Sequence, residues 1–478
     1  MLDKRWVSLV VLCVGMLMIV LDSTVVNVAL PSIQTDLGFS QANLAWVVNA
    51  YMIAFGGLLL LAGRLGDLIG SKRVFVAGIA LFTLASLLCG IAWTRELLVA
   101  ARFVQGIGGA MAASVILAMI VTMFQAPHER TKAMSVFNFT ASAGGSIGLL
   151  LGGTLSQLVN WHWIFLINVP IGVVATIVAL RLLASVPGAG LREGADVLGA
   201  VLVTASLMLA VYTVVELPVA GLASAQTFGF GATALALFAA FLVRQATAAK
   251  PLVPLTLFRS RNISGSNVLQ LLLVAGLFGF FFLDSLYMRR VLGYDAVATG
   301  LAFLPVTVAI GAFSLGWSAR LSTRFGPRAV VIGGVVLSAA GLAVFALAPL
   351  DAPYVTTIFP AMLLIGIGMG VAFPSMMMFA MSGATSSDAG LISGLVNTTA
   401  QVGGAFGLAV LATISAARTR DVVASGAGTA TALAAGYHLA FGICAGCLVA
   451  AGIIAATVLQ TPAAESASDT DASRSTAA

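Results

Sequence analysis

"VGMLMIVLDSTVVNVALP", residues 14–31, belongs to an apolar run that begins at Trp6 and is long enough to cross a lipid bilayer. The run holds one acidic residue, Asp22, and no basic residue after Arg5. An acid at mid-helix depth costs about 2.5–3.5 kcal/mol on membrane-insertion scales. A carboxylate retained at that cost marks a candidate functional site in a first membrane span, not in a cleaved signal peptide.

The composition of the whole chain indicates that lipid surrounds most of it. Of its 478 residues, 60% are hydrophobic and only 8% are charged, with a mean hydropathy of +1.08. Soluble domains carry about 25% charged residues. The net charge of +6 comes from residues scattered over short loops, so we read it as a topology signal and expect no nucleic-acid partner.

Fourteen apolar runs predict an all-α membrane protein, since a bilayer is crossed by about 17–25 residues of helix. They lie at approximately 6–30, 44–63, 74–94, 97–124, 133–158, 163–184, 197–217, 226–243, 264–288, 296–318, 329–348, 354–380, 390–416 and 437–459. The loops on the side of the N-terminus hold most of the Lys and Arg residues. The positive-inside rule therefore predicts a multi-pass protein of the cell (inner) membrane with both termini cytoplasmic.

The loops and cysteines give no sign of an enzyme. No loop is long enough to fold as a catalytic domain, and we expect no cofactor and no metal. Cys444 and Cys447 form a CxxC pattern, but without a second ligand pair we interpret them as packing residues, in preference to a redox or metal site. The polar tail at 461–478 is predicted to be disordered.

Three stretches recur in the same order at a nearly constant separation, which indicates a duplicated unit. The matches are RLGDLIGSKR at Arg64 with RLSTRFGPRA at Arg320, QGIGGA around Gly106 with IGIGMG around Gly366, and FNFTASAGGSIGLL at Phe137 with VNTTAQVGGAFGLA at Val396. The repeat predicts a six-helix N-terminal half at 1–190 and a six-helix C-terminal half at 251–460. Two inserted helices with their flanking loops fill 191–250.

Several motifs resemble those of a known family. GRLGDLIGSKR (Gly63–Arg73) resembles the signature loop between helices 2 and 3 of the major facilitator superfamily, and LVAARFVQGIGGA (Leu98–Ala110) resembles its helix-4 motif. LDSTVVNVALP (Leu21–Pro31) is similar to the helix-1 motif of the fourteen-span drug:proton antiporters. The resemblance implies the major facilitator fold, with two six-helix halves plus two extra helices.

Asp22 and Arg102 are the candidate proton-coupling residues. Arg102 is the one cation that lies away from the cytoplasmic end of a predicted span, and a guanidinium stays protonated, so it must face the bundle interior and find an acceptor. Burial disfavours the charged form of Asp22, so a change of surroundings could switch its protonation. The resemblance implies a part in proton movement. The alternatives are a purely structural Arg102 and a carboxylate bonded by the hydroxyls of Ser23 and Thr24.

The loop after the second span carries the candidate gating residues Gly63, Asp67, Gly70, Lys72 and Arg73. We expect the two glycines to allow tight backbone packing, and the acid beside the two cations to form a charge latch at the cytoplasmic mouth. The alternative is that these are solvated turn charges.

Four glycines are candidates for close helix packing: Gly106, Gly144, Gly148 and Gly152. Gly106 follows Arg102 on the predicted fourth span. The other three belong to ASAGGSIGLLLGG, which resembles the antiporter helix-5 motif, and we expect them to permit close contact between the halves.

Asp284, Phe281 and Tyr287 form the candidate substrate-binding group, on the first span of the second half. An acid among aromatic rings could bind a lipophilic cation. The alternative is an ion pair with Arg289 or Arg290, which follow on the same helix.

These features favour proton-coupled efflux of small amphipathic or cationic compounds by alternating access. The expected partners are a small-molecule substrate, protons and the lipid bilayer, and we expect a monomer. A dedicated exporter of one endogenous metabolite, lipid or siderophore is an alternative. A membrane sensor or scaffold is disfavoured, since the chain has no long partner-binding loop.

Overall fold

The computed structural model describes residues 4–40, 43–124, 127–185, 187–188, 190, 196–221, 224–381 and 389–460. The predicted disordered tail at 461–478 lies outside these residues. The helices are α1 (Lys4–Leu37), α2 (Trp46–Ile69), α3 (Ser71–Gly90), α4 (Arg95–Met123), α5 (Pro127–Leu158), α6 (Trp163–Leu166), α7 (Asn168–Leu182), α8 (Val197–Ala220), α9 (Ala225–Thr247), α10 (Arg261–Arg290), α11 (Ala296–Ala302), α12 (Leu304–Gly316), α13 (Ser318–Phe325), α14 (Pro327–Ala346), α15 (Phe359–Met381), α16 (Ala389–Ala424) and α17 (Thr429–Thr457), with short 3₁₀ turns at Asn43–Ala45 and Leu255–Arg259 and a π turn at Tyr354–Ile358.

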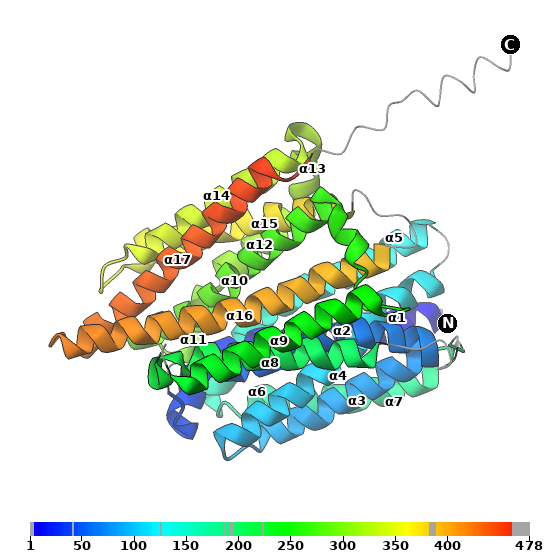
Figure 1. Cartoon of the computed structure of the whole chain (residues 1–478), viewed down its shortest axis with the longest axis horizontal. Helices are drawn as coiled ribbons and strands as arrows, with labels where there is room; N and C mark the ends of the chain where they lie inside the picture. Colours follow the sequence, from blue (N-terminus) through cyan, green and yellow to red (C-terminus); the bar gives the residue numbers. More distant parts are fainter. Residues whose placement is uncertain are drawn as a thin grey trace, which may run out of the picture.

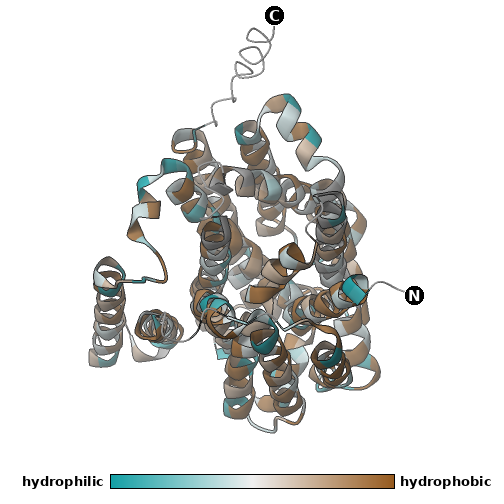
Figure 2. Ribbon diagram, turned by 90° about the vertical axis from the view of Figure 1, so that its right-hand side faces the viewer, coloured by the Kyte–Doolittle hydropathy of each residue, from teal (hydrophilic) through white to brown (hydrophobic). Residues whose placement is uncertain are grey.

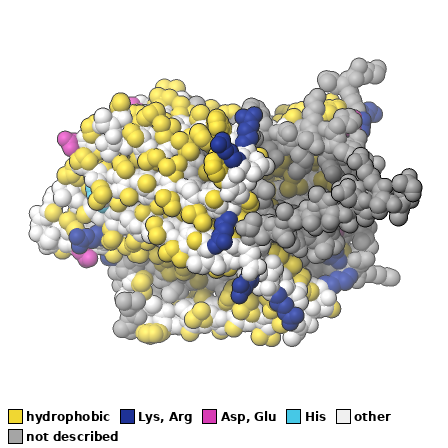
Figure 3. Space-filling model, turned by 90° about the horizontal axis from the view of Figure 1, so that it is seen from above, with side chains coloured by type: hydrophobic (Ala, Val, Ile, Leu, Met, Phe, Trp, Pro, Cys, Tyr) yellow, Lys and Arg dark blue, Asp and Glu magenta, His cyan; other side chains and the backbone are white. Residues whose placement is uncertain are grey.

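Thirteen helical segments in the described part of the chain are long and apolar enough to cross a membrane. The remaining predicted span, 133–158, falls on α5, several of whose side chains lie outside the description. Large apolar side chains such as Trp93, Leu235 and Val308 are exposed. Hydrophobic residues make up much of most helices in Figure 2, and hydrophobic side chains cover much of the described surface seen in Figure 3. The expected all-α membrane fold is confirmed.

The helices gather into two bundles (Figure 1). Helices α1–α7 form one bundle and α10–α17 the other, with α8 packed against α2 and α16, and α9 packed against α8. The bundles meet where α2 packs on α16, where α5 packs on α11 and α12, and where α1 touches α10. The division of the chain at residues 190 and 250 stays a prediction.

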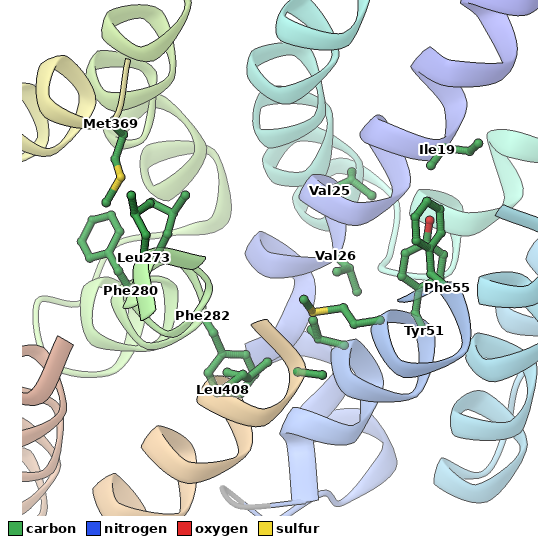
Figure 4. Packing of buried hydrophobic residues seen from close by; sticks show 14 of the residues in the cluster. Ile19, Val25, Val26, Tyr51, Phe55, Leu273, Phe280, Phe282, Met369 and Leu408 are labelled. Carbon is green, nitrogen blue, oxygen red and sulfur yellow. The ribbon is translucent and has the colours of Figure 1, made fainter. Parts of the chain in front are cut away.

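Apolar side chains fill the interior of both bundles. Figure 4 shows Ile19 of α1 near Tyr51 and Phe55 of α2 in the first bundle, and Phe280 of α10 near Met369 of α15 in the second. The interior of each bundle is thus closely packed, and the polar groups buried there need hydrogen-bond partners within the protein.

Glycines of α4 let this helix approach its neighbours closely. A Cβ at Gly106 would overlap the carbonyl oxygen of Tyr51 on α2, and a Cβ at Gly108 would lie 2.5 Å from the backbone nitrogen of Phe82 on α3. The expected packing role of Gly106 therefore agrees with its contacts. The expectation that Gly63 allows tight packing is wrong, because a Cβ there would meet only the Cβ of Ser114, at 3.8 Å.

The inserted helix α8 touches both bundles. Thr204 of α8 covers Gly57 of α2 so closely that a Cβ at Gly57 would overlap its hydroxyl. On the other side, the hydroxyl of Thr413 on α16 donates to the carbonyl of Val214 at 3.3 Å. Helix α8 therefore lies along the line where α2 and α16 meet.

Asp196, directly before α8, forms hydrogen bonds to both inserted helices and joins the start of α8 to the end of α9. Its carboxylate accepts from the backbone N–H of Gly199 at 3.0 Å, from Arg244 Nε at 2.9 Å and from Gln245 Nε2 at 2.8 Å. The Gln245 side chain also accepts from the backbone N–H of Val253 in the connector that follows α9. Burial alone would raise the pKa of Asp196, but these hydrogen bonds outweigh burial and hold that pKa below its usual range.

We expect Asp196→Asn to weaken the hydrogen bonds that join α8 to α9. Loss of hydrogen bonds to a charged group costs about 1.5–3 kcal/mol, so the apparent melting temperature in detergent should fall at neutral pH. Because the folded carboxyl has a lowered pKa, its contribution is complete above the unfolded value of about 3.9 and is lost as the pH falls through the folded value. The difference in melting temperature between the parent and Asp196→Asn should therefore shrink in acid. A difference that grows in acid would contradict the role of these hydrogen bonds.

The glycine contacts make a matched pair of variants. Gly106→Ala should lower the melting temperature, since overpacking a tight contact costs about 1–3 kcal/mol. Gly63→Ala meets open space and should melt like the parent. Equal melting temperatures for both variants, measured in one detergent, would be inconsistent with the α2–α4 contact.

Candidate functional site

Asp22 and Arg102 form an ion pair inside the first bundle. Asp22 lies midway along α1 and Arg102 lies on α4, and Arg102 Nη1 is 2.5 Å from Asp22 Oδ2. Both side chains are 0% exposed. Arg102 has thus found the acceptor that its burial requires. The carboxylate faces the inside of its own bundle, away from the surface between the bundles.

Two amides complete the surroundings of the carboxylate. Gln105 Nε2 donates to Asp22 Oδ1 at 2.8 Å, and Asn168 Nδ2 donates to the same oxygen at 3.2 Å. Gln105 Oε1 in turn accepts from Arg102 Nη1 at 2.7 Å, while Gln105 Nε2 also donates to the hydroxyl of Ser86. A guanidinium and two amides thus donate to the two oxygens of one carboxylate.

The Arg102 guanidinium also makes contacts that do not involve Asp22. Arg102 Nε donates to the carbonyl of Val47 at 2.9 Å, and the group lies 4.5 Å from the ring centre of Tyr51 and 5.5 Å from that of Phe165. Aromatic faces at these distances attract a cation. Arg102 Nη2 and the Tyr51 hydroxyl are buried without a hydrogen-bond partner among the described residues. Arg102 could therefore keep favourable contacts if Asp22 became neutral.

The alternative for Asp22, a carboxylate bonded by neighbouring hydroxyls, is wrong. Ser23 donates to the carbonyl of Val20, and Thr24 donates to the carbonyls of Val20 and Leu21. These hydroxyls satisfy themselves on the helix backbone.

The sequence prediction missed Gln105, Asn168 and Ser86. Gln105 could have been found, because it is three residues after Arg102 and so shares its helix face. Asn168 and Ser86 are small polar residues on α7 and α3, and only the packing of four helices brings them to Asp22.

The packing glycines of α5 contact α1. A Cβ at Gly144 would lie 3.1 Å from Val20, and one at Gly152 would lie 2.6 Å from the carbonyl of Val25. Gly148, between them, faces the backbone of Leu21. The expectation that the glycines of this motif join the halves is wrong for these three, because α1 and α5 belong to one bundle. They pack directly behind Asp22. The expectation is confirmed for Gly153 of the same motif, where a Cβ would lie 2.5 Å from the carbonyl oxygen of Ala296 on α11.

The predicted charge latch is not formed in this structure. The Asp67 side chain is 66% exposed, and its ion-pair partner among the described residues is Arg64, at 4.0 Å. Lys72 Nζ instead donates to the carbonyl of Leu180 at 2.9 Å, and no pairing of Asp67 with Arg73 occurs within the described chain. Gly70, with φ of 98°, forms the turn between α2 and α3 that other residues adopt only with strain.

Asp284 is buried in the second bundle at 0% exposure. Neither carboxyl oxygen has a hydrogen-bond partner within the described ranges. The alternative ion pair with the arginines of its own helix is wrong: Arg289 Nη1 donates to the hydroxyl of Ser32 and the carbonyl of Val28 on α1, and Arg290 forms no ion pair with Asp284 in the described structure.

The other predicted substrate residues have aromatic neighbours. Tyr287 is fully buried and its ring centre lies 5.7 Å from that of His438 on α17. Phe281 is half-buried, 5.5 Å from the ring of Phe303. Two apolar surface grooves lie elsewhere, between α3 and α7 and between α12 and α15. The structure thus sets Asp284 among aromatic residues but shows it enclosed.

A double-mutant cycle tests the ion pair. Asp22→Asn and Arg102→Gln each leave one buried charge unpaired, which costs about 3–5 kcal/mol. The double variant removes both charges, so its loss of stability should be smaller than the sum of the two single losses. Unfolding in detergent measures all three, with the exposed Asp351→Asn as control. Additive losses would show that the two side chains do not interact.

Comparison with known proteins gives the family. The family model described as Major Facilitator Superfamily matches residues 12–408. The chain is 38% identical to the puromycin resistance protein pur8 of Streptomyces alboniger, over 87% of this chain and 83% of that protein. It is 38% identical to the cephamycin export protein CmcT of Amycolatopsis lactamdurans, over 86% and 85%.

Solved structures agree on the fold. A bacterial homolog of the human lysosomal transporter Spinster, in an inward-facing and unoccupied conformation, superposes with a TM-score of 0.70 at 17% identity, over 98% of this chain and 100% of that one. The POT family transporter PepTSo gives a TM-score of 0.70 at 16% identity, over 94% of this chain and 97% of that one. With its motifs, its all-helical membrane fold and these relatives in agreement, the chain belongs to the Major Facilitator Superfamily and is a transporter, not an enzyme.

Proposed function

We propose that this transporter expels small amphipathic or cationic compounds, antibiotics among them, in exchange for protons by alternating access. The observation that carries the proposal is the Asp22–Arg102 pair, fully buried in a membrane bundle. Relatives named for resistance to puromycin and lincomycin support the substrate class, since they are 38% and 35% identical to this chain.

In the proposed coupling, a proton and Arg102 would compete for the carboxylate of Asp22. A proton that binds Asp22 neutralises it and weakens its attraction to Arg102. The guanidinium can then rely on Val47, Gln105 and the Tyr51 ring, with Nη2 free to bond elsewhere. Protonation therefore offers a second arrangement of the same cluster at moderate cost. An inward proton is favoured by about 2.3 kcal/mol per 100 mV of membrane potential.

Helix α1 would transmit this change to the second bundle. One turn beyond Asp22, the carbonyl of Asn27 accepts from the hydroxyl of Ser285 on α10 at 2.7 Å. Further along α1, Ser32 accepts from Arg289. A shift of α1 at Asp22 thus acts on contacts that hold the two bundles together.

The remaining assignments follow the same cycle. We propose Asp284, Phe281 and Tyr287 as substrate contacts, exposed when the bundles part. Asp67, Gly70, Lys72 and Arg73 would form the gate at the cytoplasmic end, with Asp67 released in the present conformation. We place the protein in the cell (inner) membrane with both termini in the cytoplasm, which accounts for the excess of Lys and Arg in the loops on the side of the N-terminus. We also propose that it acts as a monomer.

A dedicated exporter of one compound is the second candidate. Relatives named for cephamycin export, and for tetracenomycin C resistance and export, favour it, because each name specifies one antibiotic. A susceptibility panel of puromycin, lincomycin and ethidium on cells that produce the chain separates the two. Tolerance to several compounds supports the broad exporter, and tolerance to one supports the dedicated exporter.

Proteoliposomes with an imposed pH gradient test the coupling. The parent should transport ethidium when the gradient is present, Asp351→Asn should match it, and Asp22→Asn should lose gradient-driven transport. Retained transport by Asp22→Asn at the parent rate would remove Asp22 from the proton path.

A further inference from the structure

The two bundles place matching helices in matching positions. Gly106 of α4 packs on the carbonyl of Tyr51 in α2, and Gly366 of α15 packs on the carbonyl of Val306 in α12. Two residues later the match continues. Gly108 packs on the backbone of α3 near Gly78, and Gly368 packs on the backbone of α14 at Gly334. Helix α15 therefore stands in the second bundle where α4 stands in the first.

This correspondence shows what the second bundle lacks. Arg102 lies four residues before Gly106, and the same position before Gly366 is Met362, which is 0% exposed. Gln105 directly precedes Gly106, and Ile365 directly precedes Gly366. The second bundle thus has two apolar side chains where the first has the guanidinium and the amide that compensate its carboxylate.

Asp284 nevertheless lies on α10, the first helix of the second bundle, just as Asp22 lies on α1. Both of its oxygens are buried without a hydrogen-bond donor from the described residues. The titratable groups that interact with it electrostatically are Tyr287 on α10, Tyr294 in the loop after α10 and Tyr354 before α15. Arg289 and Arg290 follow on α10, while Tyr437 and His438 of α17 contact the ring of Tyr287. In the described structure none of them donates to the carboxyl.

An ionised carboxylate cannot stay in such a place. Burying an isolated charge costs far more than burying a neutral polar group, so the group takes up a proton instead. A neutral carboxylic acid leaves only ordinary polar atoms unsatisfied. Asp22, by contrast, accepts hydrogen bonds from three donors.

We propose that Asp284 is a second proton-binding site, protonated in this conformation and separate from the Asp22–Arg102 pair. When the bundles part and water reaches it, its O–H bond breaks, the proton passes to water and the carboxylate remains. That carboxylate, beside the rings of Phe281 and Tyr287, then accepts a substrate cation. The proton and the cation are alternative occupants of one carboxyl. This role in the cycle rests on the proposed function, whereas the protonation itself does not.

Infrared difference spectroscopy on the full chain in lipid nanodiscs, without substrate, tests the protonation. At neutral pH the C=O stretch of a protonated carboxylic acid should be present in the parent and in Asp22→Asn, and missing from Asp284→Asn. Asparagine closely matches a neutral aspartic acid, so Asp284→Asn should also melt like the parent. A parent without the band, or a band that survives Asp284→Asn, would overturn the proposal.

A transport measurement then tests the role in the cycle. With ethidium as probe and a pH-sensitive dye, protons released per ethidium should be fewer for Asp284→Asn than for the parent and Asp351→Asn. An unchanged ratio would refute exchange at Asp284. If the parent does not exchange ethidium for protons at all, the proposed function fails for this probe, while the infrared band still decides the protonation.

Discussion

A bundle packed with apolar side chains and surrounded by lipid cannot leave a charge unpaired. This constraint accounts for the arrangement around Asp22. Arg102 and Gln105 of α4 and Asn168 of α7 converge on one carboxylate from two helices, because a charge buried there must be compensated within the protein. The glycines of α5 behind it allow the helices to come close enough for this convergence.

The same constraint has a different solution in the second bundle. There the scaffold repeats the glycine contacts of the first, yet the donors are replaced by Met362 and Ile365. Asp284 in this bundle has no hydrogen-bond donor among the described residues, and we propose that it carries a proton. A duplicated fold would then hold two acids in contrasting states, one paired with a fixed cation and the other protonated.

The sequence predicted these features to different degrees. The spans followed from apolar length, and the meeting of Asp22 with Arg102 followed because a buried cation must find an acid and few acids lie within spans. Asn168 and Ser86 were not predictable, since small polar residues are common in membrane helices and their partners depend on packing. Gly144, Gly148 and Gly152 showed that a neighbour approaches closely, but not that the neighbour is α1. Asp67 was assigned the wrong partner, because charges close in sequence at a turn can point apart.

The inserted helix α8 affects how the bundles can move. Thr204 interlocks with Gly57 on α2, whereas α16 is joined by a hydrogen bond of 3.3 Å to Val214. Helix α8 packs as extensively on α16 as on α2, so a motion that separates α2 from α16 must change its contacts with one of them. Because the contact of Thr204 with Gly57 interlocks, we expect α8 and α9 to move with the first bundle and to slide against α16.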